Sequence, residues 1–177
     1  MSRPSAKNIK NLDNLFSVFK KSIPDLSLEY NTFLPHLYPT EQYTHRTEFR
    51  SLARQLISTQ IFSYNSRLFR RSKYDVNGSD FNFMSKLPGG TNAFDLINPR
   101  TSKHTSQEIL IQRFITDNNL NGISNIPIPE SRLPKRIRRK FDRLTVLSIL
   151  GLLITKEPTA SEIIINDRVL QLKGNSK

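Results

Sequence analysis

The stretch RLPKRIRRKFDRLTVLSILGLL, residues Arg132 to Leu153, decides how this chain folds because it joins a basic segment to an apolar one. Its first dozen residues carry seven basic side chains and one acid, Asp142, and the remainder is uncharged. Pro134 is placed for the first turn of a helix, where its missing N–H costs nothing. An apolar stripe continues across the charged section through Ile137, Phe141, Leu144 and Ser148. We therefore predict one helix over Pro134–Ile154, with the stripe packed on a core and the basic side chains on the other faces.

The charge balance of the chain indicates a polyanionic partner. Its 177 residues include 27 Lys and Arg against 15 Asp and Glu, which gives a formal charge of +12. Such an excess is self-repulsive in a chain of one domain's length unless an anion neutralises it. Nucleic acid is the leading candidate, and an anionic membrane surface is the second. The apolar run from Leu144 to Ile154 is much shorter than the roughly 20 residues of a transmembrane helix, so we predict no membrane span.

Catalytic and metal-binding patterns are missing from the sequence. The chain has no cysteine, and its three histidines, His36, His45 and His104, are far apart, which disfavours the usual zinc ligand sets. The LPGG segment at Leu87–Gly90 lacks the spacing and the Lys-Ser/Thr pair of a phosphate-binding loop. We therefore expect a protein that is not an enzyme, with no catalytic residues, no metal, no cofactor and no small-molecule substrate.

Hydrophobic periodicity predicts further helices on the N-terminal side of the opening stretch. One covers about Ala6–Lys21 and ends before Pro24. Another begins near Thr44 or Thr47 and can continue through Phe69. A third begins at the capping box Thr105-Ser-Gln-Glu108 and ends at about Asp117.

The C-terminal segment leaves two alternatives open. Thr159-Ala-Ser-Glu162 has the pattern of a capping box and Gly174 that of a helix stop, which favours a helix over Ala160–Lys173. Ile163–Leu172 also suits a hairpin that turns at Asn166-Asp167. The predicted fold is mainly α, a single domain over 1–177. Its helices are joined by proline-containing straps or loops at about 23–43, 72–101 and 119–133.

The first predicted helix has two readings of its own. MSRPSAKNIKNLDNLFSVFKK carries five basic residues and only Asp13 as an acid, with Leu12, Leu15, Phe16 and Phe19 on one helical face. An amphipathic, basic and acid-poor segment is typical of a mitochondrial transit peptide. An ordinary surface helix of the mature protein has the same pattern.

Two clusters of basic residues are candidate RNA-binding sites. RLFRRSKY sets its cations beside Phe69 and Tyr74, and guanidinium groups fit phosphates while aromatic rings stack on unpaired bases. The cations of this first cluster are Arg67, Arg70, Arg71 and Lys73. Those of the second, in the opening stretch, are Arg132, Lys135, Arg136, Arg138, Arg139, Lys140 and Arg143.

The segment Asn31–Leu56, NTFLPHLYPTEQYTHRTEFRSLARQL, resembles a segment of small accessory proteins in the large subunit of fungal mitochondrial ribosomes. In that family an Asn-x-Phe-Leu-Pro strap is followed by a further proline and a basic helix, after a Leu/Phe-rich helix similar to Leu12–Phe19. The family tends to carry paired arginines at the helix start, where this chain has only Arg46 and Arg50, and the C-terminal part does not match. The resemblance implies a structural role in contact with rRNA, without catalytic residues.

These observations lead to one expectation and two alternatives. We expect a structural, RNA-contacting subunit of a large ribonucleoprotein, most plausibly a mitochondrial ribosome, with rRNA and neighbouring subunits as partners. Its location would be the mitochondrial matrix, or alternatively the nucleus or nucleolus. An assembly or maturation factor of such a particle is one alternative, with Ser72–Thr101 contacting a protein partner. A DNA-binding winged-helix or helix-turn-helix protein using residues 135–173 is the other.

Overall fold

The structure is a computed structural model that describes residues 6–38, 45–73, 106–126, 128 and 130–171. The side chains at 45, 46, 65, 67–73, 106 and 130 are not described. The described part is mainly helical and contains no strand, which confirms the predicted fold class. The helices are α1 (Ala6–Ser22), α2 (Tyr30–Phe33), α3 (His45–Lys73), α6 (Ser106–Asp117), α7 (Lys135–Lys156) and α8 (Pro158–Ile164).

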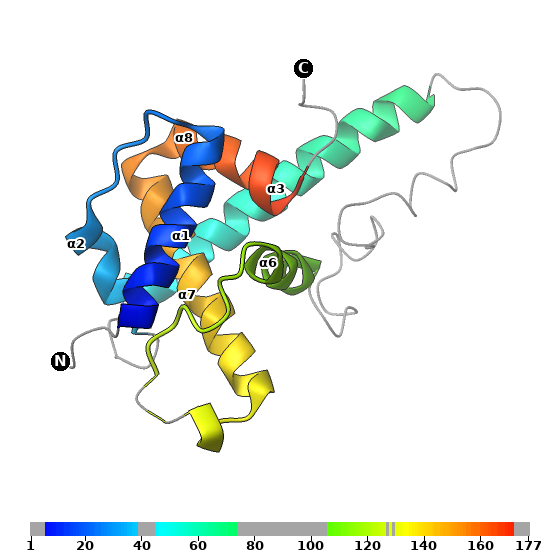
Figure 1. Ribbon diagram of the computed structural model, residues 1–177. Helices are drawn as coiled ribbons and strands as arrows, with labels where there is room; N and C mark the ends of the chain where they lie inside the picture. The colour runs from blue at the N-terminus through cyan, green and yellow to red at the C-terminus, as the bar shows by residue number, and fades with distance from the viewer. Residues whose placement is uncertain (1–5, 39–44, 74–105, 127, 129, 172–177) are drawn as a thin grey trace.

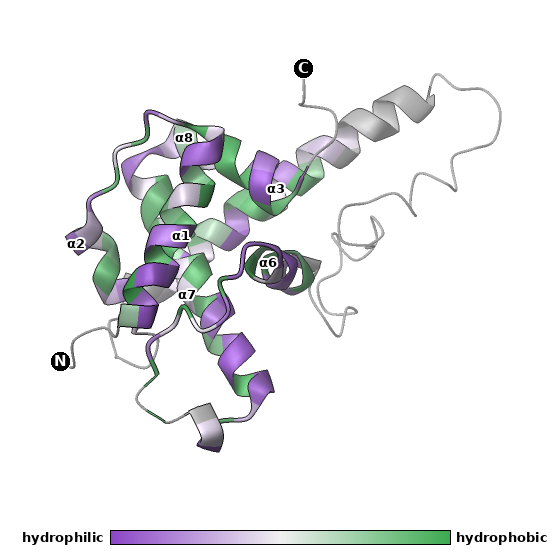
Figure 2. Cartoon of the chain, in the orientation of Figure 1, coloured by the Kyte–Doolittle hydropathy of each residue, from purple (hydrophilic) through white to green (hydrophobic). Residues whose placement is uncertain are grey.

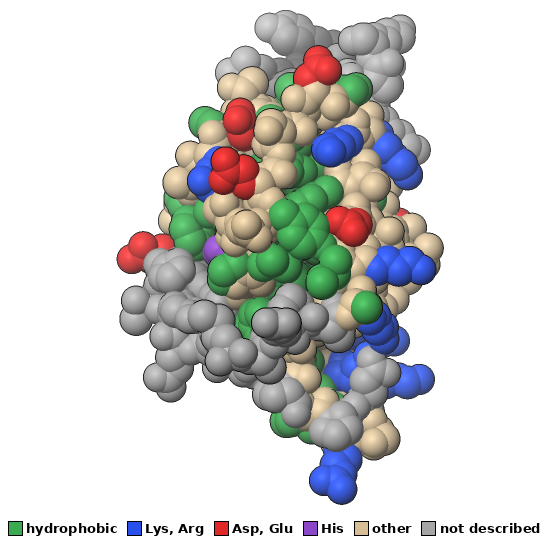
Figure 3. All heavy atoms as spheres, turned by 60° about the vertical axis from the view of Figure 1, so that its left-hand side comes forward, with side chains coloured by type: hydrophobic (Ala, Val, Ile, Leu, Met, Phe, Trp, Pro, Cys, Tyr) green, Lys and Arg blue, Asp and Glu red, His purple; other side chains and the backbone are tan. Residues whose placement is uncertain are grey.

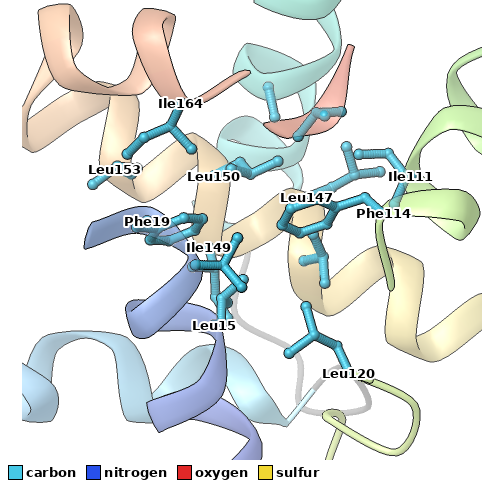
Figure 4. Close-up of a cluster of buried hydrophobic side chains, with 14 of the residues drawn as sticks. Leu15, Phe19, Ile111, Phe114, Leu120, Leu147, Ile149, Leu150, Leu153 and Ile164 are labelled. Atoms are coloured by element: carbon cyan, nitrogen blue, oxygen red, sulfur yellow. The ribbon is translucent and has the colours of Figure 1, made fainter. Parts of the chain in front are cut away.

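Helix α7 is the central element of the fold (Figure 1). It packs most extensively against α3 and also contacts α6 and α8. All its residues from Thr145 to Leu153 are buried. Figure 4 shows Leu147, Ile149 and Leu150 of α7 among apolar side chains from α1, α6 and α8. Burial of this uncharged half therefore organises the bundle, because apolar area removed from water is the main favourable term in folding.

A glycine allows α3 and α7 to cross at very short range. A Cβ atom built on Gly151 would lie only 1.8 Å from the carbonyl oxygen of Phe49 in α3. No side chain fits at that distance, since the neighbouring atoms belong to the backbone of the other helix. The crossing therefore depends on glycine at this position.

Helix α1 belongs to the core. Its bounds agree with the predicted helix, and Leu12, Leu15 and Phe19 have no exposed surface. Lys7, Lys10 and Lys20 are exposed on the opposite face, so α1 has the burial pattern of an ordinary surface helix whose apolar face packs on the core. Removing α1 as a targeting peptide would uncover the side chains of α7 and α8 that pack against it.

The strap after α1 lies on the core as expected, but it is not extended throughout. Leu26, Phe33 and Leu37 are buried, and the rings of Phe16 and Phe33 meet edge to face at 5.2 Å. The chain forms the short helix α2 and then a 3₁₀ turn over Leu34–Leu37. Pro35 is compatible with this turn because it occupies the beginning of a helical segment, where no N–H is required. Residues 39–43 of this predicted strap lie outside the described residues.

Helix α3 begins at His45, as predicted, and reaches Lys73. Ala53, Ile57 and Ile61 are fully buried against the bundle. Beyond them α3 continues away from the bundle (Figure 1), and Phe62 is 63% exposed. The predicted loop over 72–101 lies outside the described residues from 74 onwards.

The C-terminal capping box and the hairpin are both wrong. Glu157 is the N-cap of α8 without a side-chain cap bond, because Pro158 occupies the first turn and moves Thr159 inside the helix. Helical structure continues as a π-helical turn over Ile165–Val169, which places buried apolar residues where the hairpin was expected. Gln171 has a left-handed φ of 51° directly after it, so the predicted helix ends before Lys173. Gly174 and the N-cap Thr105 of α6 lie outside the described residues.

The segment between α6 and α7 is a loop, as expected for 119–133. After α6, Asn119 adopts a left-handed φ of 54°, and the N–H of Leu120 donates to the carbonyl of Ile115 at 2.9 Å. Such a residue commonly ends a helix by satisfying its last carbonyls. A 3₁₀ turn at Glu130–Arg132 then leads to Pro134, which is the N-cap of α7 and lies just outside its first turn. None of the described helices is both long enough and apolar enough to cross a bilayer.

Candidate nucleic-acid interface

The N-terminal half of α7 extends away from the bundle and is mainly hydrophilic (Figures 1 and 2). We call Lys135–Arg143 the basic spur. The predicted apolar stripe is wrong at its beginning, since Ile137 is 41% exposed and Phe141 and Leu144 are only partly buried. The first buried residue of α7 is Asp142, and burial becomes continuous from Thr145 onwards. Ser148, at the other end of the stripe, is buried as expected.

Asp142 is the only acid in the basic spur, and its carboxylate is turned inward. It accepts hydrogen bonds from the N–H of Gly122 at 2.9 Å, and from the N–H and hydroxyl of Ser124 at 3.1 and 2.8 Å. The side chain is 3% exposed. Buried carboxylates require such donors, because an unpaired buried charge is very costly. Asp142 therefore fixes a loop to α7 through its carboxylate.

Helix α1 holds the same loop from the other side. The side-chain amide of Asn8 donates to the carbonyls of Gly122, Ile123 and Ser124 at 3.1 to 3.3 Å. Asn11 reaches the carbonyl of Asn121 at 3.4 Å. The base of the basic spur is thus attached to α1 through a hydrogen-bonded loop, which gives its exposed part a defined direction.

The basic spur borders a groove that it shares with α6. The cavity has a volume of about 560 Å³ and is lined by Glu108, Ile109, Gln112, Arg113, Thr116, Asp117, Arg136, Arg139 and Arg143. A smaller cavity of about 220 Å³, which shares Arg139 with the first, is lined by Asn121, Gly122, Lys135, Arg138, Arg139 and Asp142. We call the first of these the α6–α7 groove. Arginine side chains come from both of its walls.

Hydrogen bonds fix the inner arginines of the α6–α7 groove. Arg143 donates to the Oε1 of Gln112 at 3.0 Å, and Gln112 donates from its Nε2 to the hydroxyl of Thr116 at 3.3 Å. Arg113 donates to the carbonyl of Val169 at 3.0 Å. Arg136 and Arg139 are exposed, and their side chains form no hydrogen bond or ion pair with another described residue. The outer pair is therefore available to an anion.

The predicted binding residues fall into two groups. The second cluster is brought together at the lower tip of the molecule, and Figure 3 shows Lys and Arg side chains along one side of the molecule down to that tip. Arg132, Lys135, Arg136, Arg139 and Lys140 are exposed, while Arg138 and Arg143 are partly buried. Of the first cluster, Arg67, Arg70, Arg71 and Lys73 lie in the last turns of α3, and their side chains are outside the described residues.

Sequence reasoning missed Arg113, the groove arginine contributed by α6. It is a single cation in the segment EILIQRFITD, so no cluster drew attention to it. Its spacing from Ile109 and Thr116 places it with them on one side of α6, but nothing in that pattern tells that α7 lies opposite. The contact between the two helices is needed to find it.

Other titratable groups are used for packing. His36 is buried, with its Nδ1 hydrogen-bonded to the hydroxyl of Ser148 and its ring 5.4 Å from that of Phe49.

On α3, burial and then the charge of Arg54 lower the pKa of Arg50. The side chains of His45 and His104 are outside the described residues. Within the part that the structure describes, no three His, Cys, Asp or Glu side chains are grouped as a metal site would require.

Among the described residues 135–171, the helix-turn-helix interpretation has no basic recognition helix. Helix α8, PTASEII, has no cation, and Glu162 is exposed on it. The following π-helical turn carries Arg168, whose Nε donates to the hydroxyl of Ser22 at 2.8 Å. Helices that enter the major groove rely on basic and polar side chains toward the DNA. Most of the exposed cations of α7 lie at its opposite end, and Lys156 is the exposed cation next to α8.

We compared the chain with known proteins, and no family model, curated protein or solved structure matches it.

Proposed function

We propose that this protein is a structural, RNA-contacting subunit of a large ribonucleoprotein. The observation that carries the proposal is the basic spur, where exposed cations project from the bundle while the only acid, Asp142, is bonded to loop donors on the inner side. Phosphate contacts by Lys and Arg supply most of the affinity of proteins for nucleic acid without reading sequence. A structural subunit needs that kind of contact.

The energetics of the basic spur favour a bound anion over a merely solvated face. Like charges four residues apart on a helix destabilise it by roughly 0.2–0.5 kcal/mol per pair. The spur contains three such pairs, which are Lys135 with Arg139, Arg136 with Lys140, and Arg139 with Arg143. Neutralisation by phosphates removes this repulsion, so binding of a polyanion stabilises the helix that binds it.

We further propose a mitochondrial ribosome as the particle, with the mitochondrial matrix as the location. The support is the resemblance of Asn31–Leu56 to accessory proteins of that particle. In this chain the resembling segment supplies Phe33 and Leu37 to the core and begins α3. The segment is therefore part of the folded unit that presents the basic spur.

Sedimentation of the tagged native chain tests the proposal. We expect the chain to co-sediment with a large particle and to move to light fractions after RNase treatment. Presence in mature particles supports a permanent subunit, whereas presence only in precursor particles supports an assembly factor. Light sedimentation without RNase, or release by DNase alone, would contradict the proposed function.

A further inference from the structure

We propose that the α6–α7 groove binds the phosphodiester backbone of double-helical RNA and does not read its bases. This inference rests on the proposed function and names the form of RNA that the site takes. It is carried by three properties of the groove, which are its charge, its length and the types of side chain that line it.

The charge of the groove is concentrated on one wall. Arg136, Arg139 and Arg143 are spaced at i, i+3 and i+7, so they share one face of α7, and all three line the groove. The two carboxylates, Glu108 and Asp117, both belong to α6. An anionic backbone is therefore expected to follow the α7 wall, with Arg113 as the one cation opposite.

The length of this wall suits a ligand that carries more than one phosphate. Arg136 and Arg143 are seven residues apart, which is about 10 Å along a helix that rises 1.5 Å per residue. Arg143 already donates to Gln112 at the inner end, so Arg136 and Arg139 are the cations that face an incoming ligand. A nucleic-acid strand that runs along the wall offers a phosphate to each of them.

The lining residues favour backbone contacts over base contacts. None of the described residues that line the groove is aromatic; its apolar member is Ile109, which is 47% exposed. Proteins that hold single strands commonly combine a basic groove with aromatic rings on which the bases stack. Double-helical RNA is instead recognised through its shape, phosphates and 2′-hydroxyl groups. Thr116 is exposed, and its hydroxyl keeps a hydrogen to donate, which suits the last of these.

The test measures binding of the full chain to a short RNA duplex and to a single strand of equal length, over a range of salt concentrations. We expect the duplex to bind more tightly, and duplexes of unrelated sequence to bind equally. Arg136→Gln with Arg139→Gln should make the log–log salt slope less steep by about two, because each lost phosphate contact contributes about one. Arg136→Lys with Arg139→Lys should keep most of the slope, since the charges remain.

The matched control is Lys135→Gln with Lys140→Gln, which removes the same charge from the same half of α7 outside the α6–α7 groove. We expect this pair to change the slope by less than the arginine pair. Equal changes in the two variants, or tighter binding of the single strand, would overturn the groove assignment and leave RNA contact by the spur standing. Failure of the wild-type chain to bind either RNA would overturn both the groove and the proposed function.

Discussion

The two halves of α7 have the same backbone structure and opposite environments. From Thr145 to Leu153 every residue is buried and uncharged, whereas Lys135, Arg136, Arg139 and Lys140 are exposed. Helix propensity does not explain the burial, because the Lys and Arg residues of the exposed half are better helix formers than Thr145, Val146 and Gly151 of the buried half. The difference lies in what covers each half. Core packing stabilises the C-terminal half, and the continuous helix holds the N-terminal half outside the bundle.

This comparison teaches that one helix can separate stability from binding by position along its axis. Asp142 marks the boundary, since it is the first buried residue of α7 and fixes the loop at Gly122–Ser124. Substitutions on the two sides of this residue should therefore have different consequences.

The largest effect on stability is expected in the buried half. Leu150→Ala should lower the free energy of unfolding by about 2–5 kcal/mol, because the fully buried side chain leaves a cavity in the core. Ile137→Ala is the matched change in the basic spur and should cost clearly less, since Ile137 is 41% exposed. Chemical denaturation of the two variants measures the difference. Equal losses would contradict the division of α7.

The next effect concerns the crossing of α3 and α7. Gly151→Ala should destabilise the protein by about 1–3 kcal/mol, because the added methyl group meets the backbone at Phe49 and the helices must move apart. The matched control is Ser51→Ala, an exposed position on α3 that should stay within about ±0.5 kcal/mol. A stable Gly151→Ala variant would show that the crossing is looser than described.

Asp142→Ala sharpens the comparison at the boundary. The donors of Gly122 and Ser124 lose their acceptor, and leaving buried donors unpaired costs about 1–3 kcal/mol. Hydrogen exchange should become faster at the amides of Gly122 and Ser124 and stay slow in the buried half of α7. Unchanged protection of those two amides would show that the carboxylate does not hold the loop.

The smallest effect on stability is expected from Tyr30, which lies outside α7. Burial, followed by the charge of Asp13, raises the pKa of Tyr30 above its ordinary value of 10.0. The folded protein holds this proton more tightly than the unfolded chain, so the contribution to stability is full below pH 10 and declines as the pH rises further. Tyr30→Phe should flatten this alkaline decline in a titration of stability against pH. If the stability of the variant declines in the same way at alkaline pH, the decline comes from other titrating groups.

The sequence predicts where the helices lie along the chain better than it predicts which of their residues are buried. Periodicity and the positions of prolines place α1, α3, α6 and α7 to within a few residues, because these signals are local. The stripe at Ile137, Phe141 and Leu144 was assigned to the core wrongly, since periodicity shows which residues share a face and not how far the neighbouring elements reach. Thr159 has the spacing of a cap, but Pro158 shifts the helix start by fixing its own φ.

The candidate interface is predictable only in part for a similar reason. The cations of the basic spur are visible as a run from Lys135 to Arg143. The sequence does not distinguish Asp142 from an exposed acid of the basic spur, because the partners of Asp142 are backbone groups of a distant loop. Arg113 belongs to the groove only through the packing of α6 on α7.

The most direct test of the division of α7 combines two readings on one variant, Arg136→Gln with Arg139→Gln. Its free energy of unfolding should stay within about ±0.5 kcal/mol of the wild-type value, because both side chains are exposed. In cells, the same chain should move from the particle fractions to the light fractions on sedimentation. A variant that is equally stable and remains in the particle as the wild type does would contradict the assignment of the basic spur to RNA.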